Sequence, residues 1–299
     1  MDMLHITDLY KSFGDKEVLC GLNLSVPEHS IFGFIGKNGA GKTTAMKTIL
    51  GLIRADAGEI VVNGEKVVYG QTATNRHVGY LPDVPEFYPF MTAMEYLRFC
   101  GEISGINKSE NDKRCRELLE LVGLGNEMHR IKGFSRGMKQ RLGIAQALLN
   151  RPKLLICDEP TSALDPVGRK EILDILLAVR EQTTILFSTH ILSDVERICT
   201  DVALLDRGVA CMQGKVSDIK NRYRREAYQL ELDNDGDMSV LKKAFPEIRR
   251  NDKNQIVFLE SDHTLFEVLD FVTQRQIPFS RLERIEPTLE SLFMEVTQK

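Results

Sequence analysis

The chain has 299 residues, of which 42% are hydrophobic and 27% are charged, and its formal net charge is −4 at pH 7. This balance is typical of a folded globular protein with one large or two ordinary domains, and the slight acidity argues against a surface that coats nucleic acid. We expect no signal peptide, and no apolar run approaches the roughly 18 residues that span a bilayer. The six cysteines form no Cys-x-x-Cys pair, so we expect free thiols in a reducing cytosol, with neither a zinc site nor a disulfide framework.

Residues 3–30 are expected to form β structure. Short apolar runs there are broken by turn residues, as in a series of strands. Phe13 precedes Gly14 in one of these turns. It is either a core aromatic residue or a loop residue that stacks on an adenine ring.

Residues 31–50 contain the strongest motif of the chain. The apolar run over 31–35 predicts a buried strand, and apolar residues at helical spacing from Thr44 onward predict a helix that Gly51 ends. Between them stands G-x-x-x-x-G-K-[ST], in the order Gly36, Lys37, Asn38, Gly39, Ala40, Gly41, Lys42 and Thr43. A strand, a glycine loop and a helix in this order predict a loop that binds the phosphates of a nucleoside triphosphate.

The residue types of this motif suit that task. Glycines let the backbone turn tightly with several N–H groups pointing inward, and the start of the helix adds a partial positive charge. Lys42 would reach the β- and γ-phosphates as a point charge. The Thr43 hydroxyl would be a ligand of Mg²⁺.

The middle of the chain is predicted to contain an inserted helical subdomain at about 83–150. A hairpin is predicted over 59–68, with Asn63-Gly64 as its turn, and the proline-broken stretch 77–91 is not helical throughout. Helices are predicted at about 92–104, 109–122 and 134–149, the last with Ser135 as its N-cap. This last helix is either an ordinary amphipathic core helix or one whose serine and glycine start forms a second anion-binding end.

Two acids follow a predicted buried strand over 154–157. Acids at the carboxyl end of a parallel strand lie in the crevice where ligands bind in open α/β sheets. Asp158 would hold the hydration shell of Mg²⁺, and Glu159 would orient and deprotonate an attacking water. After a helix at about 167–181 and a strand over 184–188, His190 is either structural or a contact of the γ-phosphate. A hairpin over 202–212 follows.

The composition changes at about residue 217. The basic run 220–226 is either a solvated linker helix or a contact for acidic lipid head groups or nucleic acid. From residue 227 we expect a small α+β domain without a catalytic cluster. Its predicted strands cover 228–232, 255–259 and 278–284, and its predicted helices cover 239–245, 264–274 and 288–297.

In this order, the motifs resemble those of the nucleotide-binding subunit of an ABC transporter. Residues 36–44 resemble its Walker A motif, 154–159 its Walker B motif with the catalytic glutamate, and 135–140 stand where its signature would be. Residues 162–165 resemble the D-loop, His190 the switch histidine, and Phe13 the aromatic residue that stacks on adenine. The tail 283–297 is similar to the closing segment of bacitracin and multidrug exporter ATPases of the ABC-2 type.

The resemblance implies a P-loop NTPase core of the α/β class over residues 1–217. This core would carry an antiparallel β subdomain and the inserted helical subdomain, and a small accessory α+β domain would follow at 218–299. The implied cofactors are ATP and Mg²⁺. The implied catalytic residues are Glu159, His190 and Lys42, and the implied metal ligands are Thr43, Asp158 and Asp83. The implied nucleotide contacts are Phe13, Gly36, Asn38, Gly39, Ala40, Gly41, Lys42, Thr43 and Thr44, with Ser135 and Gly137 across a subunit interface.

The resemblance also implies a way of working. Two subunits, alike or different, would pack head to tail, so that ATP lies between the Walker A motif of one and Ser135 and Gly137 of the other. Closure would be passed to a separate membrane permease through residues 83–100, and export would follow. The chain would be cytoplasmic and held at the inner face of the membrane by that permease, without a nucleic-acid partner.

Two motifs, the Q-loop and the signature, depart from the family pattern, and other functions stay open. Asp83 stands where the family has the Q-loop glutamine, and an ionised aspartate can still ligate Mg²⁺ but cannot donate a hydrogen bond. Arg136 replaces a signature glycine, and Met138 replaces its glutamine. The alternatives are a soluble ABC ATPase that acts on nucleic acid or the ribosome, and a nucleotide-gated regulatory subunit with little hydrolysis.

Overall fold

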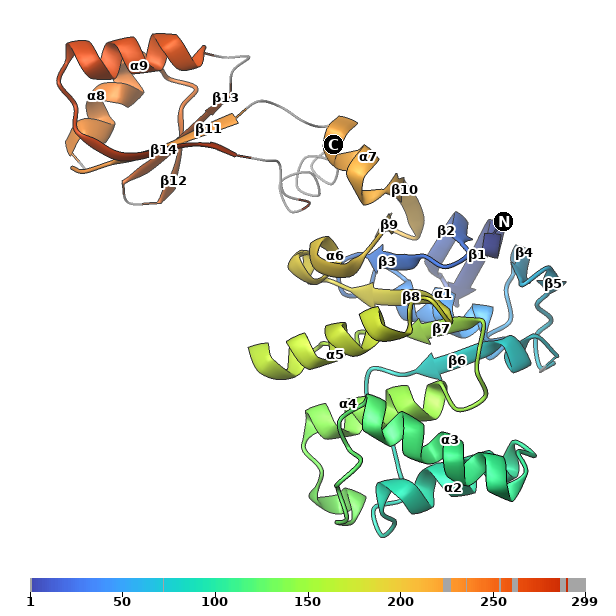
Figure 1. Cartoon of the computed structure of the whole chain (residues 1–299). Coiled ribbons are helices and arrows are strands. Elements are labelled where there is room, and N and C mark those ends of the chain that lie inside the picture. The colour runs from blue at the N-terminus through green and yellow to red at the C-terminus, as the bar shows by residue number, and fades with distance from the viewer. Residues whose placement is uncertain are drawn as a thin grey trace. The chain divides into compact units, whose positions relative to one another are not determined.

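The computed structural model of the chain (Figure 1) describes residues 2–71, 73–222, 227–234, 236–252, 254–259, 263–285 and Leu289. The chain divides into two compact units, Met1–Val216 and Ser217–Lys299. Each unit has a hydrophobic core of its own.

The first unit begins with an antiparallel sheet in the order β2-β1-β4-β5. Its strands are β1 (Asp2–Phe13), β2 (Lys16–Pro27), β4 (Ala57–Val62) and β5 (Glu65–Lys66). Buried and exposed side chains largely alternate along β1 and β2, so one face of the sheet packs on the core. The predicted hairpin is confirmed: Asn63 and Gly64 both have positive φ, at 48° and 77°, although β5 is only two residues long.

A second sheet, in the order β10-β9-β3-β8-β7-β6, carries the motif-bearing strands. They are β3 (Ile31–Ile35), β6 (Val78–Leu81), β7 (Leu154–Cys157), β8 (Thr184–Thr189), β9 (Asp201–Asp206) and β10 (Val209–Lys215). All neighbours pair in parallel except β9 and β10, so β3, β6, β7 and β8 have their carboxyl ends at one edge. The predictions of strands over 31–35, 154–157 and 184–188 are confirmed, and all three strands are buried.

Helices cover both faces of this second sheet (Figure 1). α1 (Lys42–Ile49) shares one core with the antiparallel sheet and with β3 and β7. It begins two residues before its predicted start, because the left-handed backbone of Gly41 (φ 110°) ends the loop there. α5 (Pro166–Val179) is largely buried along one face, and α6 (Leu192–Ile198) packs on β3, where a Cβ at Gly33 would lie 3.1 Å from Val195.

The helical insertion between β6 and β7 has the predicted elements. Its α-helices are α2 (Ala93–Ile103), α3 (Lys108–Leu121) and α4 (Arg136–Ala147), and short 3-10 turns lie at Ala73–His77 before β6 and at Ile131–Gly133 before α4. Each of the three helices is started by a side-chain cap, from Thr92, Asn107 and Ser135 respectively. α4 lies so close to β6 that a Cβ at Gly79 would be 2.2 Å from the carbonyl oxygen of Ala147. This contact fixes the end of α4 against the sheet.

The second unit is a small α+β fold with an antiparallel sheet in the order β12-β13-β11-β14. Its elements are β11 (Ala227–Leu232), α8 (Gly236–Ala244), β12 (Arg249–Asp252), β13 (Gln255–Leu259), α9 (Leu265–Gln274) and β14 (Phe279–Ile285). This is the β-α-β-β-α-β order of ferredoxin-like folds. The sequence did not predict β12, because its polar residues lack a strand pattern. The predicted helix over 288–297 lies outside the described residues, except Leu289.

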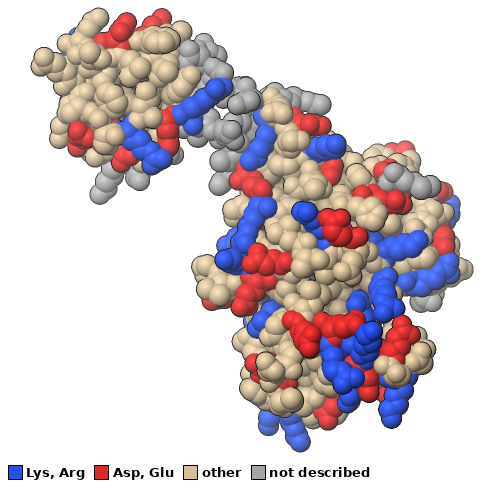
Figure 2. Space-filling model, in the orientation of Figure 1, with Lys and Arg blue, Asp and Glu red and all other residues tan. Residues whose placement is uncertain are grey.

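The basic run begins within a helix, since α7 (Val216–Arg222) covers its first residues. The rest of the run, 223–226, lies outside the described residues. On the face shown in Figure 2, positive and negative side chains of the first unit are interspersed. Ion pairs also link side chains of the helical insertion, for example Arg98–Asp112 and Arg151–Glu110. No helix within the described residues is long and apolar enough to cross a membrane.

Candidate active site

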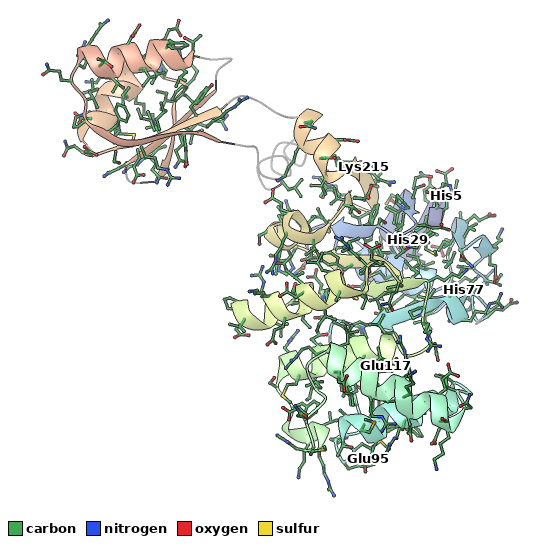
Figure 3. The ribbon with its side chains drawn as sticks, viewed as in Figure 1. His5, His29, His77, Glu95, Glu117 and Lys215 are labelled. Carbon is green, nitrogen blue, oxygen red and sulfur yellow. The ribbon has the colours of Figure 1, made fainter. Side chains whose placement is uncertain are left out.

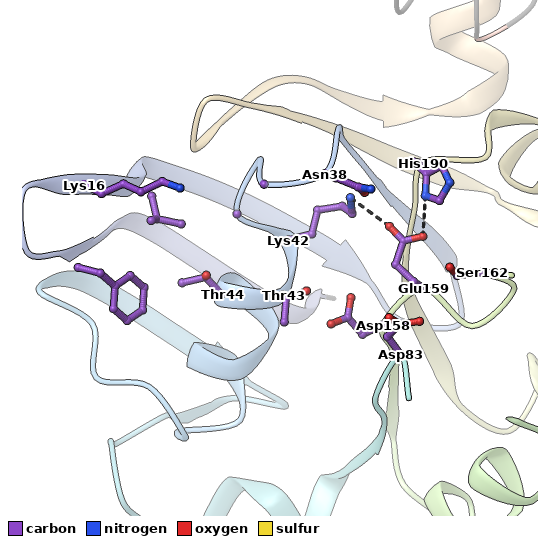
Figure 4. Close-up of a pocket in the computed structure, with 14 residues that line it drawn as sticks. Lys16, Asn38, Lys42, Thr43, Thr44, Asp83, Asp158, Glu159, Ser162 and His190 are labelled. Carbon is purple, nitrogen blue, oxygen red and sulfur yellow. Dashed lines mark hydrogen bonds and ion pairs between the residues drawn. The ribbon is translucent and has the colours of Figure 1, made fainter. Parts of the chain in front are cut away.

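A cavity of about 470 Å³ opens where the phosphate-loop motif faces the carboxyl ends of the parallel strands. The motif and the start of α1 contribute Asn38, Gly39, Gly41, Lys42, Thr43 and Thr44, and the strand ends contribute Asp83, Asp158, Glu159, Ser162 and His190. The antiparallel sheet completes the wall with Phe13, Lys16 and Val18. Figure 4 shows these side chains converging on one space. Segments as far apart in sequence as 13 and 190 therefore line one cavity.

The loop between β3 and α1 has the backbone that the motif predicts. Gly39 and Gly41 have φ of 84° and 110°, and a Cβ at Gly41 would lie 2.9 Å from the carbonyl oxygen of Val18. Lys42 curls back over the loop and donates to the carbonyl oxygen of Gly36 at 2.6 Å. Its ammonium group is thereby held at the mouth of the loop, with only 5% of the residue exposed.

Glu159, the second of the two predicted acids, contacts the lysine of the phosphate-loop motif. Its Oε1 lies 3.1 Å from the Lys42 ammonium, and its Oε2 lies 2.9 Å from His190 Nδ1 (Figure 4). Among the described residues, this Oε1 is buried and has no hydrogen bond besides its ion pair with Lys42. One carboxylate thus bridges two predicted catalytic groups, and one of its oxygens has an unsatisfied acceptor position.

Ser188, which the sequence analysis did not single out, holds both acids. Its hydroxyl donates to Asp158 Oδ1 at 2.6 Å and accepts from the Glu159 amide at 2.9 Å. Ser188 is fully buried on β8, and Glu159 has a positive φ of 48° that this bond helps to fix. Its position at the end of a parallel strand, beside the acids of β7, is the signal that would have found it.

Like charges crowd the acidic side of the cavity. Burial raises the pKa of Asp83 from its ordinary value, and the charges of Asp158 and Glu159 act in the same direction, whereas Arg136 opposes them. Burial, aided by the charge of Asp158, raises the pKa of Tyr80 to about 12. The site therefore favours a cation beside its carboxylates.

The donor set fits Mg²⁺ bound together with nucleotide phosphates. Thr43, Asp158 and Asp83 offer hard oxygen atoms around one cavity, and Mg²⁺ commonly takes one or two carboxylates plus phosphate oxygens. Within the described part of the chain, no group of three or more His, Cys, Asp or Glu side chains is placed to hold a metal ion by itself. The phosphates would have to complete such a coordination shell.

His190 is set apart from other histidines by its place. His5, His29 and His77, which are labelled in Figure 3, do not line the cavity, and His77 instead contacts Glu65 at 3.2 Å. His190 follows β8 directly and reaches the cavity. Phe13 is 50% exposed at the end of β1, so it is not a core residue, and the Lys11 ammonium lies 5.2 Å from its ring centroid.

The predicted signature residues lie outside this cavity. Ser135 caps α4 and accepts a hydrogen bond from the Met138 amide at 3.2 Å, and Gly137 follows in the first turn. Gly36 and Ala40 belong to the loop but do not line the cavity; a Cβ at Gly36 would lie 2.7 Å from the Leu205 carbonyl oxygen. Lys16 and Val18 line it although the sequence analysis did not name them.

Known proteins resemble this chain along its whole length. Residues 19–162 match the family described as ABC transporter, and residues 214–297 match the family described as ATP-binding protein DrrA1-3-like, C-terminal domain. The ABC transporter ATP-binding protein YxlF of Bacillus subtilis (strain 168) is 36% identical over 297 residues, covering 98% of this chain and 99% of that protein. The bacitracin transport ATP-binding protein BcrA of Bacillus licheniformis is 37% identical over 272 residues, covering 90% and 81%.

A solved structure extends this likeness to the fold. The structure of an ATP-binding subunit of an ABC transporter superposes with a TM-score of 0.66 at 32% identity, covering 74% of this chain and 93% of that one. The predicted P-loop NTPase fold with a further C-terminal domain is thereby confirmed. With its phosphate loop facing two strand-end acids, the chain belongs to the ATP-binding subunits of ABC transporters, a family of ATPases.

Proposed function

We propose that the chain hydrolyses ATP with Glu159 as general base, Lys42 as the cation on the β- and γ-phosphates, and His190 as a γ-phosphate contact. The observation that carries this proposal is the bridge of Glu159 to both other groups, at 3.1 and 2.9 Å. The γ-phosphate would bind the Lys42 ammonium and replace Glu159 as its partner. The carboxylate would then be available to orient and deprotonate water.

The rest of the cavity supports binding of Mg-ATP. Inward N–H groups of the glycine loop and the start of α1 would hold the phosphates, and Phe13, half exposed on the antiparallel sheet, would stack on adenine. Thr43, Asp158 and Asp83 would hold Mg²⁺. The metal would neutralise charge that develops on the phosphates.

We infer a head-to-tail pair of subunits from the placement of the two half-sites. Ser135 and Gly137 begin α4, and neither lines the cavity that contains Lys42 and Glu159. A second subunit would supply these groups to the nucleotide. Either another copy of this chain or a related chain would serve.

We propose that the pair drives export through a separate permease, which would hold the chain at the inner face of the membrane. The name of BcrA, a bacitracin transport protein, supports an exporter. Residues 83–100 would contact the permease, since Val84, Tyr88 and Phe90 are 62%, 47% and 60% exposed there. We assign residues 1–217 to the nucleotide-binding domain and 218–299 to an accessory domain.

The test is gel filtration and ATP hydrolysis of Glu159→Gln. We expect a monomer that becomes a dimer only with ATP and Mg²⁺, and a hydrolysis rate about a hundredfold or more below that of the unmodified chain. Glu181→Gln, at a side chain that is 80% exposed, is the matched control and should hydrolyse normally. EDTA should abolish both dimerisation and hydrolysis. A Glu159→Gln rate above a tenth of normal would exclude Glu159 as the base, and a persistent monomer that binds ATP would contradict pairing of two copies.

A further inference from the structure

Two of the residues that depart from the family pattern, Asp83 and Arg136, contact each other. Asp83 Oδ1 accepts a hydrogen bond from Arg136 Nη2 at 3.2 Å, across 53 positions of sequence. Asp83 lines the nucleotide cavity, whereas Arg136 begins α4 between Ser135 and Gly137. The pair therefore joins a residue that faces this chain's own nucleotide to the segment that would face the partner's nucleotide.

α4 contacts Asp83 in two ways, one buried and one exposed. Gln140, one turn after Arg136 on the same side of α4, is fully buried and donates to the Asp83 backbone carbonyl at 2.6 Å. The Arg136 and Asp83 side chains are 43% and 47% exposed and share a single hydrogen bond. Exposed ion pairs of this kind shift an equilibrium by about fivefold or less. The backbone contact is thus firm, and the side-chain pair can exchange partners at little cost.

Both side chains have stronger alternative partners in the proposed cycle. Asp83 lies among like charges and is a proposed ligand of Mg²⁺, so its carboxylate would exchange the guanidinium for the metal. A guanidinium binds phosphate oxygens through two parallel charge-assisted hydrogen bonds. Such a bond to a charged group shifts an equilibrium by roughly tenfold or more, which exceeds the strength of the present pair.

We propose that Asp83 binds the Arg136 guanidinium until Mg-ATP enters the cavity. Binding of Mg-ATP then frees the guanidinium to contact the triphosphate of the nucleotide held by a second copy of the chain. This inference rests on the proposed head-to-tail pairing. Occupancy of one chain's cavity then determines whether the other chain's nucleotide receives an additional positive charge. The signature segment of this chain thereby gains a phosphate contact that a glycine at position 136 cannot make.

The experiment measures the ATP concentration that gives half-maximal dimerisation, in the Glu159→Gln chain with Mg²⁺, by analytical ultracentrifugation. Arg136→Gln should raise this concentration about tenfold. Arg151→Gln, which breaks a similarly exposed pair with Glu110 (2.9 Å) away from the cavity, is the matched control and should not change it. The affinity of the monomer for Mg-ATP, measured by equilibrium dialysis below the dimerisation concentration, should not fall with Arg136→Gln. It should rise by up to about fivefold, because Mg²⁺ no longer displaces the guanidinium from Asp83.

The same substitution in the Asp83→Asn variant distinguishes a guanidinium that is released to bind phosphate from an ion pair that is only structural. With Asp83→Asn present, Arg136→Gln should still raise the half-maximal ATP concentration about tenfold, because the freed guanidinium still binds phosphate. If the effect disappears in this background, the pair is only structural and the inference is wrong. A loss of monomer affinity would place the contact within one chain and also overturn it.

The outcomes also distinguish this inference from the function it rests on. If the parent Glu159→Gln chain binds ATP but stays monomeric, pairing of two copies is refuted and the inference falls with it. If the parent dimerises and Arg136→Gln behaves like the parent, only the inference is refuted.

Discussion

The ion pair between Lys42 and Glu159 should stabilise the nucleotide-free chain more than an exposed pair of the same chemistry. The two side chains are 6% and 14% exposed, and their charged atoms lie 3.1 Å apart. At an effective dielectric constant of about 20, the Coulomb attraction at this distance is about 5 kcal/mol. Desolvation of both ions offsets most of it, so we expect a net coupling energy of about 2 kcal/mol.

The perturbations are Lys42→Met, Glu159→Gln and the double variant. Lys42→Met should lower the free energy of unfolding by about 3 kcal/mol, because it leaves a nearly buried carboxylate without its cation. Glu159→Gln should lower the free energy of unfolding by about 1 kcal/mol, since the ammonium keeps the carbonyl oxygens of Gly36 and Lys37 as acceptors. The double variant should cost about 2 kcal/mol less than the sum of the single variants.

The assay is urea unfolding in EDTA without nucleotide, followed by circular dichroism because the chain has no tryptophan. The matched control is the cycle of Lys66→Met and Glu59→Gln, whose pair is closer (2.6 Å) but 62% and 49% exposed. Its coupling energy should be below about 1 kcal/mol. Equal coupling energies in the two cycles would refute the argument that burial strengthens the Lys42–Glu159 pair.

Two further substitutions test how the site and its scaffold are held. Ser188→Ala should lower the free energy of unfolding by about 1–2 kcal/mol, because Asp158 loses its hydroxyl donor at 2.6 Å. It should also lower kcat for ATP about tenfold with KM little changed. An unchanged kcat would show that the serine does not position the acids. Gly79→Ala should lower the free energy of unfolding, measured by thermal unfolding, by more than about 2 kcal/mol, since its Cβ would lie 2.2 Å from the Ala147 carbonyl oxygen. Gly133→Ala, where no heavy atom lies within 4 Å of the added Cβ, should change it by about 0.5 kcal/mol or less. Similar costs for the two glycines would contradict the close packing of α4 on β6.

Local patterns in the sequence were enough to predict the strand–loop–helix unit around Lys42. Glycine spacing, an apolar run and helical periodicity all act over a few residues, so neighbouring positions along the chain contain the whole signal. The same holds for Asp158 and Glu159, because a strand end can be recognised from the residues on either side of it. The strands over 31–35, 154–157 and 184–188 and the start of α4 at its Ser135 cap are confirmed for this reason. The strand β12 was missed because its polar residues carry no such local signal.

Only the tertiary structure decided which of these residues touch. The Glu159–Lys42 contact, the bond of Ser188 to Asp158 and the pair of Asp83 with Arg136 join positions 30 to 117 residues apart. Which side chains meet across such separations depends on the order of strands in the sheet and on how α4 packs against β6, and neither is encoded in spacing along the chain. The sequence alone determined the chemistry that the site can offer, since residue types set charge, nucleophilicity and ligand preference. The tertiary structure decided which groups act together, because these contacts depend on distances of about 3 Å between atoms that only the packed fold brings into reach.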